Sequence, residues 1–179
     1  MVAVPDERAA PQGDASRSAA RQVVEEIHAL HAQHIWGFVR RLGLGDEEAA
    51  DVTQEALLRL WRACRDGDAP ERPLAWTFRI AFRLAMDRHR LRRRWTALIG
   101  GGHPSADGEP GEQRDELLAV WSEVDRLPER QRQVLYLRYR ADLPFDEIGS
   151  VLGIDASSAR ANASRGIASL RDRLGEEGE

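Results

Sequence analysis

Apolar side chains recur every three or four residues through most of this chain, and no stretch of useful length alternates apolar and polar residues as a half-buried β-strand does. The spacing predicts three helices in the first half, at about residues 19–42, 46–65 and 73–95. It predicts four more in the second half, one from about Leu117 and three that follow Leu127, Pro144 and Asp155. The chain is therefore expected to be all-α.

The helical pattern is lost between Thr96 and about Gln113, where glycine and proline are frequent. We interpret this stretch as a flexible linker between two small helical domains, which a chain of 179 residues has room for. The predicted organisation is a disordered tail at 1–18, a three-helix domain at 19–95, the linker at 96–113, a four-helix domain at 114–175 and an acidic tail at 176–179.

Several classes of protein are excluded by what the sequence lacks. Cys64 is the single cysteine, so an internal disulfide is excluded. No apolar run reaches the roughly 18 residues of a membrane span, and no secretory signal is visible, so a soluble cytoplasmic protein is expected. His28, His31 and His34 are spaced three apart, but no nearby cysteine completes a metal site. We predict no metal, no cofactor and no enzymatic activity, since motifs for these are missing.

Positive charge is concentrated in one segment, although the chain as a whole is acidic. The formal net charge is −4, and all 26 basic residues are arginines. Between residues 71 and 94 there are eight arginines and two acidic residues, a local charge of +6 that leaves −10 for the rest. Clustered cations are the electrostatic footprint of phosphate binding, so this segment is a candidate nucleic-acid site.

Aromatic residues are interleaved with these arginines, a combination that holds single-stranded nucleic acid by phosphate pairing and base stacking. The aromatics can equally be core residues, and we favour that interpretation for Phe78 and Trp76. Cations at the end of a helix also stabilise its dipole, and we expect both effects in the run from Arg92 to Arg94. The candidate residues of this segment are Trp76, Arg79, Arg83, Arg88, Arg90, Arg92, Arg93 and Arg94.

The segment from Pro144 to Leu174 has the layout of a helix-turn-helix: a short helix, a turn at Gly153 and a longer helix capped by Asp155. In that motif the first residues of the second helix meet base edges in the major groove. Arg160 can pair with guanine or phosphate, and Arg165, further along the same helix, suits contact with the DNA backbone. A plain helical hairpin with a solvated polar face has the same layout. The candidate DNA-binding residues are Ser157, Ser158, Arg160, Asn162 and Arg165.

A series of short motifs runs through the second half: Leu127-Pro128-Glu129-Arg130, Val134-Leu135, Leu137-Arg138-Tyr139, Glu147-Ile148-Gly149 and Val151-Leu152-Gly153-Ile154. In order and spacing the series resembles region 4 of sigma-70 transcription initiation factors. The resemblance implies that this domain reads the −35 promoter element and docks on the β flap of RNA polymerase. The sequence departs from the family pattern at Gly149, Ser158-Ala159, Asn162 and Gly166, which bears on the strength and sequence preference of the −35 contact.

Two motifs of the first half point the same way. Ala75-Trp76-Thr77-Phe78-Arg79-Ile80-Ala81 and Ala85-Met86-Asp87, with the arginines that follow, resemble regions 2.3 and 2.4 of extracytoplasmic-function (ECF) sigma factors, which recognise the −10 element. Asp51-Val52-Thr53-Gln54-Glu55-Ala56, followed by Trp61, resembles region 2.2, which grips the clamp helices of the β′ subunit. Arg83 stands where the family commonly has Asn, and it either adds phosphate affinity or alters base choice.

The predicted polymerase-binding residues are Asp51, Gln54 and Glu55, whose spacing places them on one exposed helix face opposite the apolar stripe. The resemblance as a whole implies a small sigma-70 factor of the ECF subfamily, because the acidic domain between these regions in large housekeeping sigma factors is missing. Its implied partners are core RNA polymerase, promoter DNA and an anti-sigma factor, and the free chain is expected to be a monomer. Two alternatives stay open: a stand-alone helix-turn-helix regulator, and a sigma-like decoy that binds an anti-sigma protein without supporting transcription.

Overall fold

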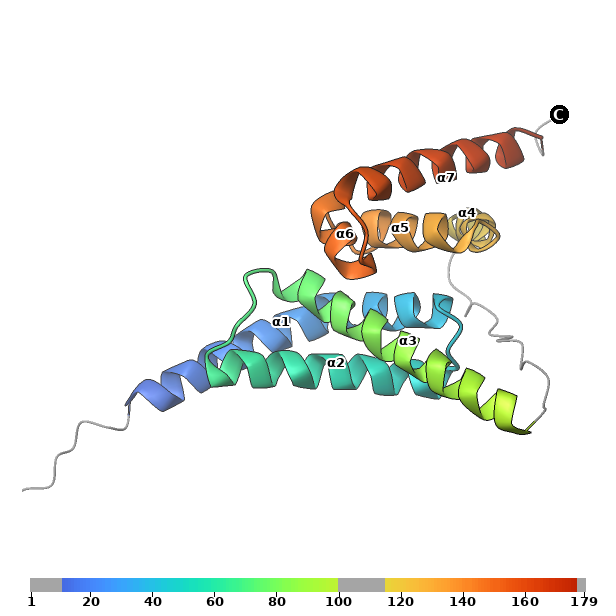
Figure 1. Ribbon diagram of the computed structural model, residues 1–179. Coiled ribbons are helices and arrows are strands. Elements are labelled where there is room, and N and C mark those ends of the chain that lie inside the picture. The colour runs from blue at the N-terminus through green and yellow to red at the C-terminus, as the bar shows by residue number, and fades with distance from the viewer. Residues whose placement is uncertain (1–10, 100–114, 177–179) are drawn as a thin grey trace, which may run out of the picture.

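The computed structural model describes residues 11–99 and 115–176, which form seven α-helices and no strand (Figure 1). Three long helices make an N-terminal bundle: α1 (Pro11–Arg41), α2 (Asp46–Asp66) and α3 (Pro73–Ile99). Four helices make the C-terminal domain: α4 (Asp115–Asp125), α5 (Glu129–Tyr139), α6 (Phe145–Leu152) and α7 (Ala156–Glu176). The predicted fold class, all-α with a three-helix and a four-helix part, is confirmed.

Some expected boundaries are wrong by several residues. Helix α1 begins at Pro11, so residues 11–18 are helical and not disordered. Its apolar stripe continues in front of Ile27, where Ala20 is buried and Val23 packs against the core. Helix α3 runs to Ile99, so residues 96–99 are helical and not linker, and Glu176 ends α7 rather than opening a tail. The remaining residues of the predicted tails and linker, 1–10, 100–113 and 177–179, lie outside the described part of the chain.

The N-terminus of α2 is stabilised although its N-cap residue, a glycine, has no side chain to cap the helix. The N-cap is Gly45, and Asp46 is the first residue of the helix. The backbone N–H of Gly45 donates to the carboxylate of Glu48 at 3.2 Å, and Asp46 pairs with the side chain of Arg40 at 2.5 Å. Three acidic residues in the first turn complement the positive end of the helix dipole.

The core of the bundle is formed where α1 crosses α2 and α3. Phe38 of α1 and Phe78 of α3 are fully buried and meet edge to face, with ring centres 5.6 Å apart. Phe82 also packs against the ring of Phe38, at 6.4 Å. Burial of Phe78 confirms the preference for a core role over base stacking at that position, because a fully buried ring presents no face to a nucleic-acid base.

The predicted helix-turn-helix is present in the C-terminal domain. Gly153, which follows α6, adopts a left-handed backbone with φ of 68°, a conformation that a side chain disfavours. Asp155 then caps α7, as expected: its carboxylate accepts hydrogen bonds from the Ser158 backbone N–H at 2.7 Å and from the Ser157 and Ser158 hydroxyls at 2.5 and 2.8 Å. These hydrogen bonds, that from the Ser157 hydroxyl first, hold the pKa of Asp155 well below its usual range.

The two halves of the chain pack against each other. Helix α6 lies against α3, and α5 touches α1, so that α6 is placed between α3 and α7 (Figure 1). Tyr136 of α5 is only 3 % exposed, and its ring lies 5.9 Å from that of Phe38 in α1. A sequence that suggests two independently tethered domains therefore folds with a shared apolar contact between them.

Candidate nucleic-acid interface

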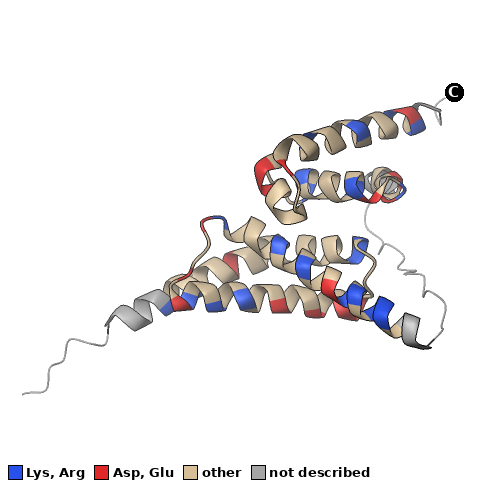
Figure 2. Ribbon diagram, in the orientation of Figure 1, with Lys and Arg blue, Asp and Glu red and all other residues tan. Residues whose placement is uncertain are grey.

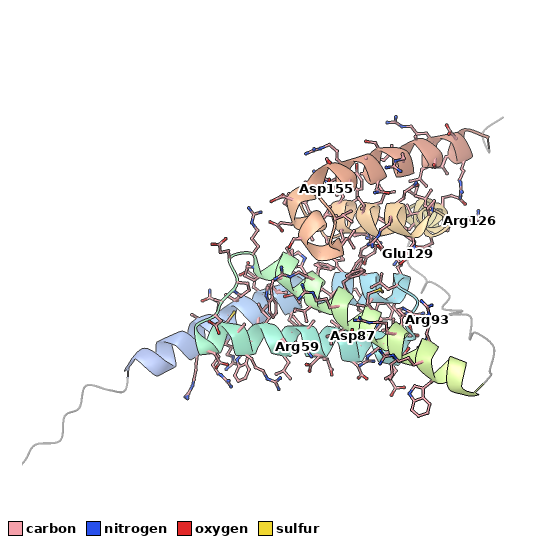
Figure 3. All side chains as sticks on the ribbon, in the orientation of Figure 1. Arg59, Asp87, Arg93, Arg126, Glu129 and Asp155 are labelled. Atoms are coloured by element: carbon pink, nitrogen blue, oxygen red, sulfur yellow. The ribbon has the colours of Figure 1, made fainter. Side chains whose placement is uncertain are left out.

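Arginines occur along much of α3 (Figure 2), and they differ in whether acidic groups pair with them. Arg83, Arg93 and Arg94 are exposed, and no ion pair is recorded for them in the described part of the chain. Arg93 projects from the bundle near the end of α3 (Figure 3). These three side chains are free to meet phosphates, and they present part of the positive charge of the sequence segment on an accessible surface.

Other predicted arginines are partly engaged by acidic groups. Arg92 donates to the Glu48 carboxylate at 2.6 Å, and its hydrogen bond holds the pKa of Glu48 below the usual value. Arg88 donates to the backbone oxygen of Glu48 at 3.2 Å and lies 3.8 Å from Asp51. Arg90 pairs with Asp87 one turn earlier in the same helix. The contacts of Arg88 and Arg92 hold α2 against α3, a structural role that the sequence pattern does not reveal.

Arg79 and Trp76 lie on the part of α3 that faces α6. Arg79 donates to the Ser150 hydroxyl at 3.4 Å, while its Nε is buried without a hydrogen-bond partner. Trp76 is half-buried, and with Arg79 it lines a cleft of about 490 Å³ between the start of α3 and α6. In this arrangement Arg79 contacts the C-terminal domain, and Trp76 lines the cleft beside it.

Trp95 is an aromatic candidate that the predicted set of residues leaves out. It is 58 % exposed at the far end of α3, next to Arg93 and Arg94. An exposed indole beside free guanidinium groups is the arrangement that stacks an unpaired base while cations hold its phosphate. The sequence carried this signal, because Trp95 directly follows the arginine run.

The first turns of α7 present a second exposed surface. Arg160 and Arg165 are exposed. The guanidinium of Arg160 lies 5.3 Å from the ring centre of Phe145 in α6, and this cation–π contact holds the Arg160 side chain at the exposed start of α7. Asn162 is half-buried, and its amide donates to the Ser158 backbone oxygen at 2.9 Å. Because the Ser157 and Ser158 hydroxyls already serve the Asp155 cap, labelled in Figure 3, the arginines are the freest polar groups for a ligand.

The predicted polymerase-binding face lies on α2. Asp51 and Gln54 are exposed, and Glu55 is half-buried and pairs with Arg59 at 2.7 Å. Ala49, Val52 and other apolar residues of the same helix are buried against the bundle. The three side chains thus share the outer face of α2, as their spacing predicts.

Gly149, one of the departures from the region 4 pattern, is required by the turn of the helix-turn-helix. The backbone N–H of Ile154 donates to the Gly149 oxygen at 3.0 Å, and a Cβ on residue 149 would lie 2.6 Å from the Ile154 carbonyl oxygen. We expect Gly149→Ala to lower the free energy of unfolding by about 1–3 kcal/mol, because backbone must move to admit the methyl group. Urea unfolding followed by circular dichroism measures this.

Gly166→Ala is the matched control for that substitution. The nearest atom to its Cβ would be Leu135 Cδ1 at 2.9 Å, which belongs to a side chain that can rotate. Alanine also gains about 1 kcal/mol of helix propensity there, so the net loss should be smaller. Equal unfolding midpoints for the wild-type chain and Gly149→Ala would contradict the proposed crowding.

Three further features of the described residues concern the single cysteine, metal binding and membrane spans. Cys64 is half-buried against the core, and burial raises the pKa of its thiol, which fits packing rather than redox chemistry. No cluster of three His, Cys, Asp or Glu side chains able to hold a metal occurs in residues 17–95 or 120–174. None of the helices in the described ranges combines the length and the apolar character of a membrane span.

The fold and these surfaces define a class of protein: an all-helical DNA-binding protein with a basic helix in one domain and a helix-turn-helix in the other. Residues 27–96 match the family Sigma-70 region 2, and residues 117–170 match Sigma-70, region 4. The chain belongs to the sigma-70 family and is a promoter-recognising RNA polymerase sigma factor of the ECF type, as its sequence predicts. This family is not a class of enzymes.

Related sequences and solved structures match this chain over most of its length. The RNA polymerase sigma factor CarQ of Myxococcus xanthus is 30% identical over 168 residues, which cover 89% of this chain and 94% of that protein. The ECF sigma factor SigW of Bacillus subtilis is 28% identical over 83% of this chain and 87% of its own length. The sigma factor RpoE, from a complex with the anti-sigma factor NepR from Bartonella quintana, shares the fold with a TM-score of 0.67 at 18% identity, over 84% of this chain and 96% of that one. CnrH, in complex with the cytosolic domain of CnrY, gives a TM-score of 0.58 at 24% identity, over 92% and 95% of the two chains.

Proposed function

We propose that this sigma factor binds the β′ clamp helices of core polymerase through the outer face of α2 and contacts the −10 element with α3. We further propose that α7 reads the −35 element while the C-terminal domain docks on the β flap. One observation carries this division of roles. Gln54 on α2, Arg83 and Arg93 on α3, and Arg160 on α7 are exposed at the same time, so one chain can contact polymerase and two DNA elements together.

The chemistry of each surface suits its proposed ligand. The face formed by Asp51, Gln54 and Glu55 offers carboxylates and an amide to a basic partner helix. Exposed arginines beside Trp95 offer charge and stacking to melted DNA. Two weak DNA contacts held at fixed separation by polymerase reinforce each other, because the second contact forms within an existing complex.

The same proposal covers the setting in which the protein works. We place it in the bacterial cytoplasm, as a monomer when free and associated with the nucleoid when active. An anti-sigma protein is the expected negative regulator. The sigma factor RpoE, which has the same fold, was solved in complex with the anti-sigma factor NepR, and CnrH, which also has this fold, was solved with the cytosolic domain of CnrY.

Run-off transcription with purified core polymerase on a pool of promoters, with sequencing of transcript starts, tests the proposal. We expect RNA that starts at defined sites and depends on the added chain. A decoy would bind core polymerase or an anti-sigma protein without producing such transcripts. A stand-alone regulator would bind duplex DNA specifically as a free dimer.

Replacing Arg160 by alanine is expected to weaken promoter use through the −35 element. Loss of one specific side-chain contact to a base pair costs about 1–3 kcal/mol, so transcription from a template with a −35 element should fall by about 10-fold. On a template that lacks the −35 element the variant and the wild-type chain should be equal. Arg171→Ala, an exposed arginine later in α7, is the control. An unchanged ratio between the two templates would refute the assignment.

A further inference from the structure

A cluster of cationic and ionisable side chains lies where the C-terminal half of α1 meets α4 and α5 (Figure 1). The guanidinium groups of Arg41 in α1 and of Arg140, which follows α5, lie 5.8 and 5.2 Å from the ring centre of Trp121 in α4. The rings of His31 and His34, three residues apart on α1, have their centres 6.0 Å from each other. Two permanent cations and two histidines are therefore gathered at one helix junction.

The backbone of His34 is also the point at which α5 is attached to α1. The hydroxyl of Tyr136 donates to the backbone oxygen of His34 at 3.0 Å. The contact requires glycine at residue 37, because a Cβ there would lie 2.5 Å from the Tyr136 hydroxyl oxygen. Burial raises the pKa of Tyr136 to about 12, so its hydroxyl stays protonated at neutral and acidic pH. A change of charge near neutral pH at this contact therefore comes from histidine and not from Tyr136.

The surroundings of His34 favour its neutral form. The side chain is half-buried, and its Nδ1 is buried without a hydrogen-bond partner. Burial, and then the charges of His31 and Arg140, lower the pKa of His34, since each of them disfavours an imidazolium ion. An acidic partner would act in the opposite direction, but Asp125 of α4 is already paired with Arg41 at 3.0 Å.

Charged groups on the other helices that pack around α1 do not supply a partner either. Their acidic residues already contact other groups: Asp46 and Glu55 of α2 pair with Arg40 and Arg59, Glu129 of α5 accepts from Gln133, and Asp142 lies by Arg138. Arg79 of α3 is itself a cation, and it donates to Ser150. A proton on His34 therefore joins a positively charged cluster and gains no carboxylate in return.

We propose that His34 is a pH-sensitive element of the junction, and that its protonation weakens the contact of α5 with α1 in the free chain. Once the helices separate, His34 is solvated and no longer close to Arg140, so the separated form binds a proton more tightly than the docked form does. The contact thus has its full strength above the ordinary pKa of histidine, about 6.5, and loses strength as the pH falls below it. This sensitivity to acid goes beyond the proposed function and does not depend on it.

Energy transfer between two fluorophores, at nanomolar concentrations of the full-length chain, measures the fraction of separated molecules. The fluorophores are attached through Glu26→Cys in α1 and Ala168→Cys in α7, two exposed positions, in a chain that also carries Cys64→Ala. In this parent chain the ratio of separated to docked molecules should rise several-fold between about pH 7.5 and about pH 5.5. Uptake of one proton limits the rise to about 10-fold per pH unit.

Four substitutions in the parent chain separate the proposed cause from a general effect of acid. His34→Gln stays neutral at every pH and should abolish the rise, whereas His34→Arg should loosen the junction already at about pH 7.5. His28→Gln, at an exposed position of α1, is the matched control and should respond to pH as the parent chain does. Gly37→Ala, whose methyl group displaces Tyr136, provides the signal of a loosened junction without new charge.

The proposal is overturned if energy transfer in the parent chain is constant over this range, or if His34→Gln keeps the pH dependence of the parent chain. Either result leaves the proposed function standing, because run-off transcription tests that function separately. If the pH dependence is found and depends on His34 while no promoter-specific transcript forms, the pH-sensitive junction stands and the proposed function falls.

Discussion

Gln54→Arg should weaken binding of core polymerase by about 30-fold, which corresponds to about 2 kcal/mol. Gln54 is exposed at the centre of the proposed polymerase-binding face on α2, between Asp51 and Glu55. A cation at this position would oppose a basic partner helix, whereas the wild-type amide and its acidic neighbours attract it. The helix itself should be unaffected, because arginine is a good helix former.

Competition between labelled and unlabelled sigma for core polymerase measures this loss directly. Gln33→Arg makes the same chemical change at an exposed site of α1 and should bind as the wild-type chain does. Circular dichroism of both variants should match the wild type. If Gln54→Arg binds core polymerase with wild-type affinity, the outer face of α2 is not the contact surface, and another face of the bundle must take that role.

Replacing Arg83, Arg93 and Arg94 together by glutamine should lower formation of the open promoter complex by about 100-fold at moderate salt. These three arginines of α3 are exposed and form no ion pair within the described part of the chain. Their loss should therefore remove phosphate contacts without breaking the pairs between α2 and α3. Each contact to a single strand contributes about −0.7 to the slope of log affinity against log salt, so the slope should become shallower by about 2.

The matched control replaces Arg17, Arg21 and Arg65 by glutamine. It removes the same charge from α1 and from the end of α2, away from the arginine run of α3 (Figure 2). Heparin-resistant complexes on a promoter template, measured over a range of salt, compare the two variants. A salt slope equal to that of the wild type in the α3 variant would show that these arginines do not meet phosphate. Equal losses in both variants would indicate a general charge effect.

Local patterns in the sequence were sufficient for the helices and for much of the site. The Asp155 cap, the turn at Gly153 and the exposed face at Asp51 and Gln54 each depend on residues close together in the chain, so spacing alone predicts them. The start of α1 is not marked by such a pattern, because residues 11–18 carry no large apolar side chain and include Gly13, which is disfavoured inside a helix. Gly149 is visible in the sequence as a departure from the family pattern, but its reason lies in a contact with Ile154 that only the folded turn creates.

The sequence by itself determined the class of the protein, because helical periodicity, a basic aromatic segment and the helix-turn-helix pattern are all encoded within short windows. The tertiary structure alone decided which arginines are free. Arg92 reaches Glu48 across 44 positions of the chain, and Arg79 reaches Ser150 across 71. The docking of Tyr136 on α1 joins positions 102 residues apart. Pairings at such separations depend on how helices pack, and packing is set by side-chain shapes from several helices at once, which no single window of sequence contains.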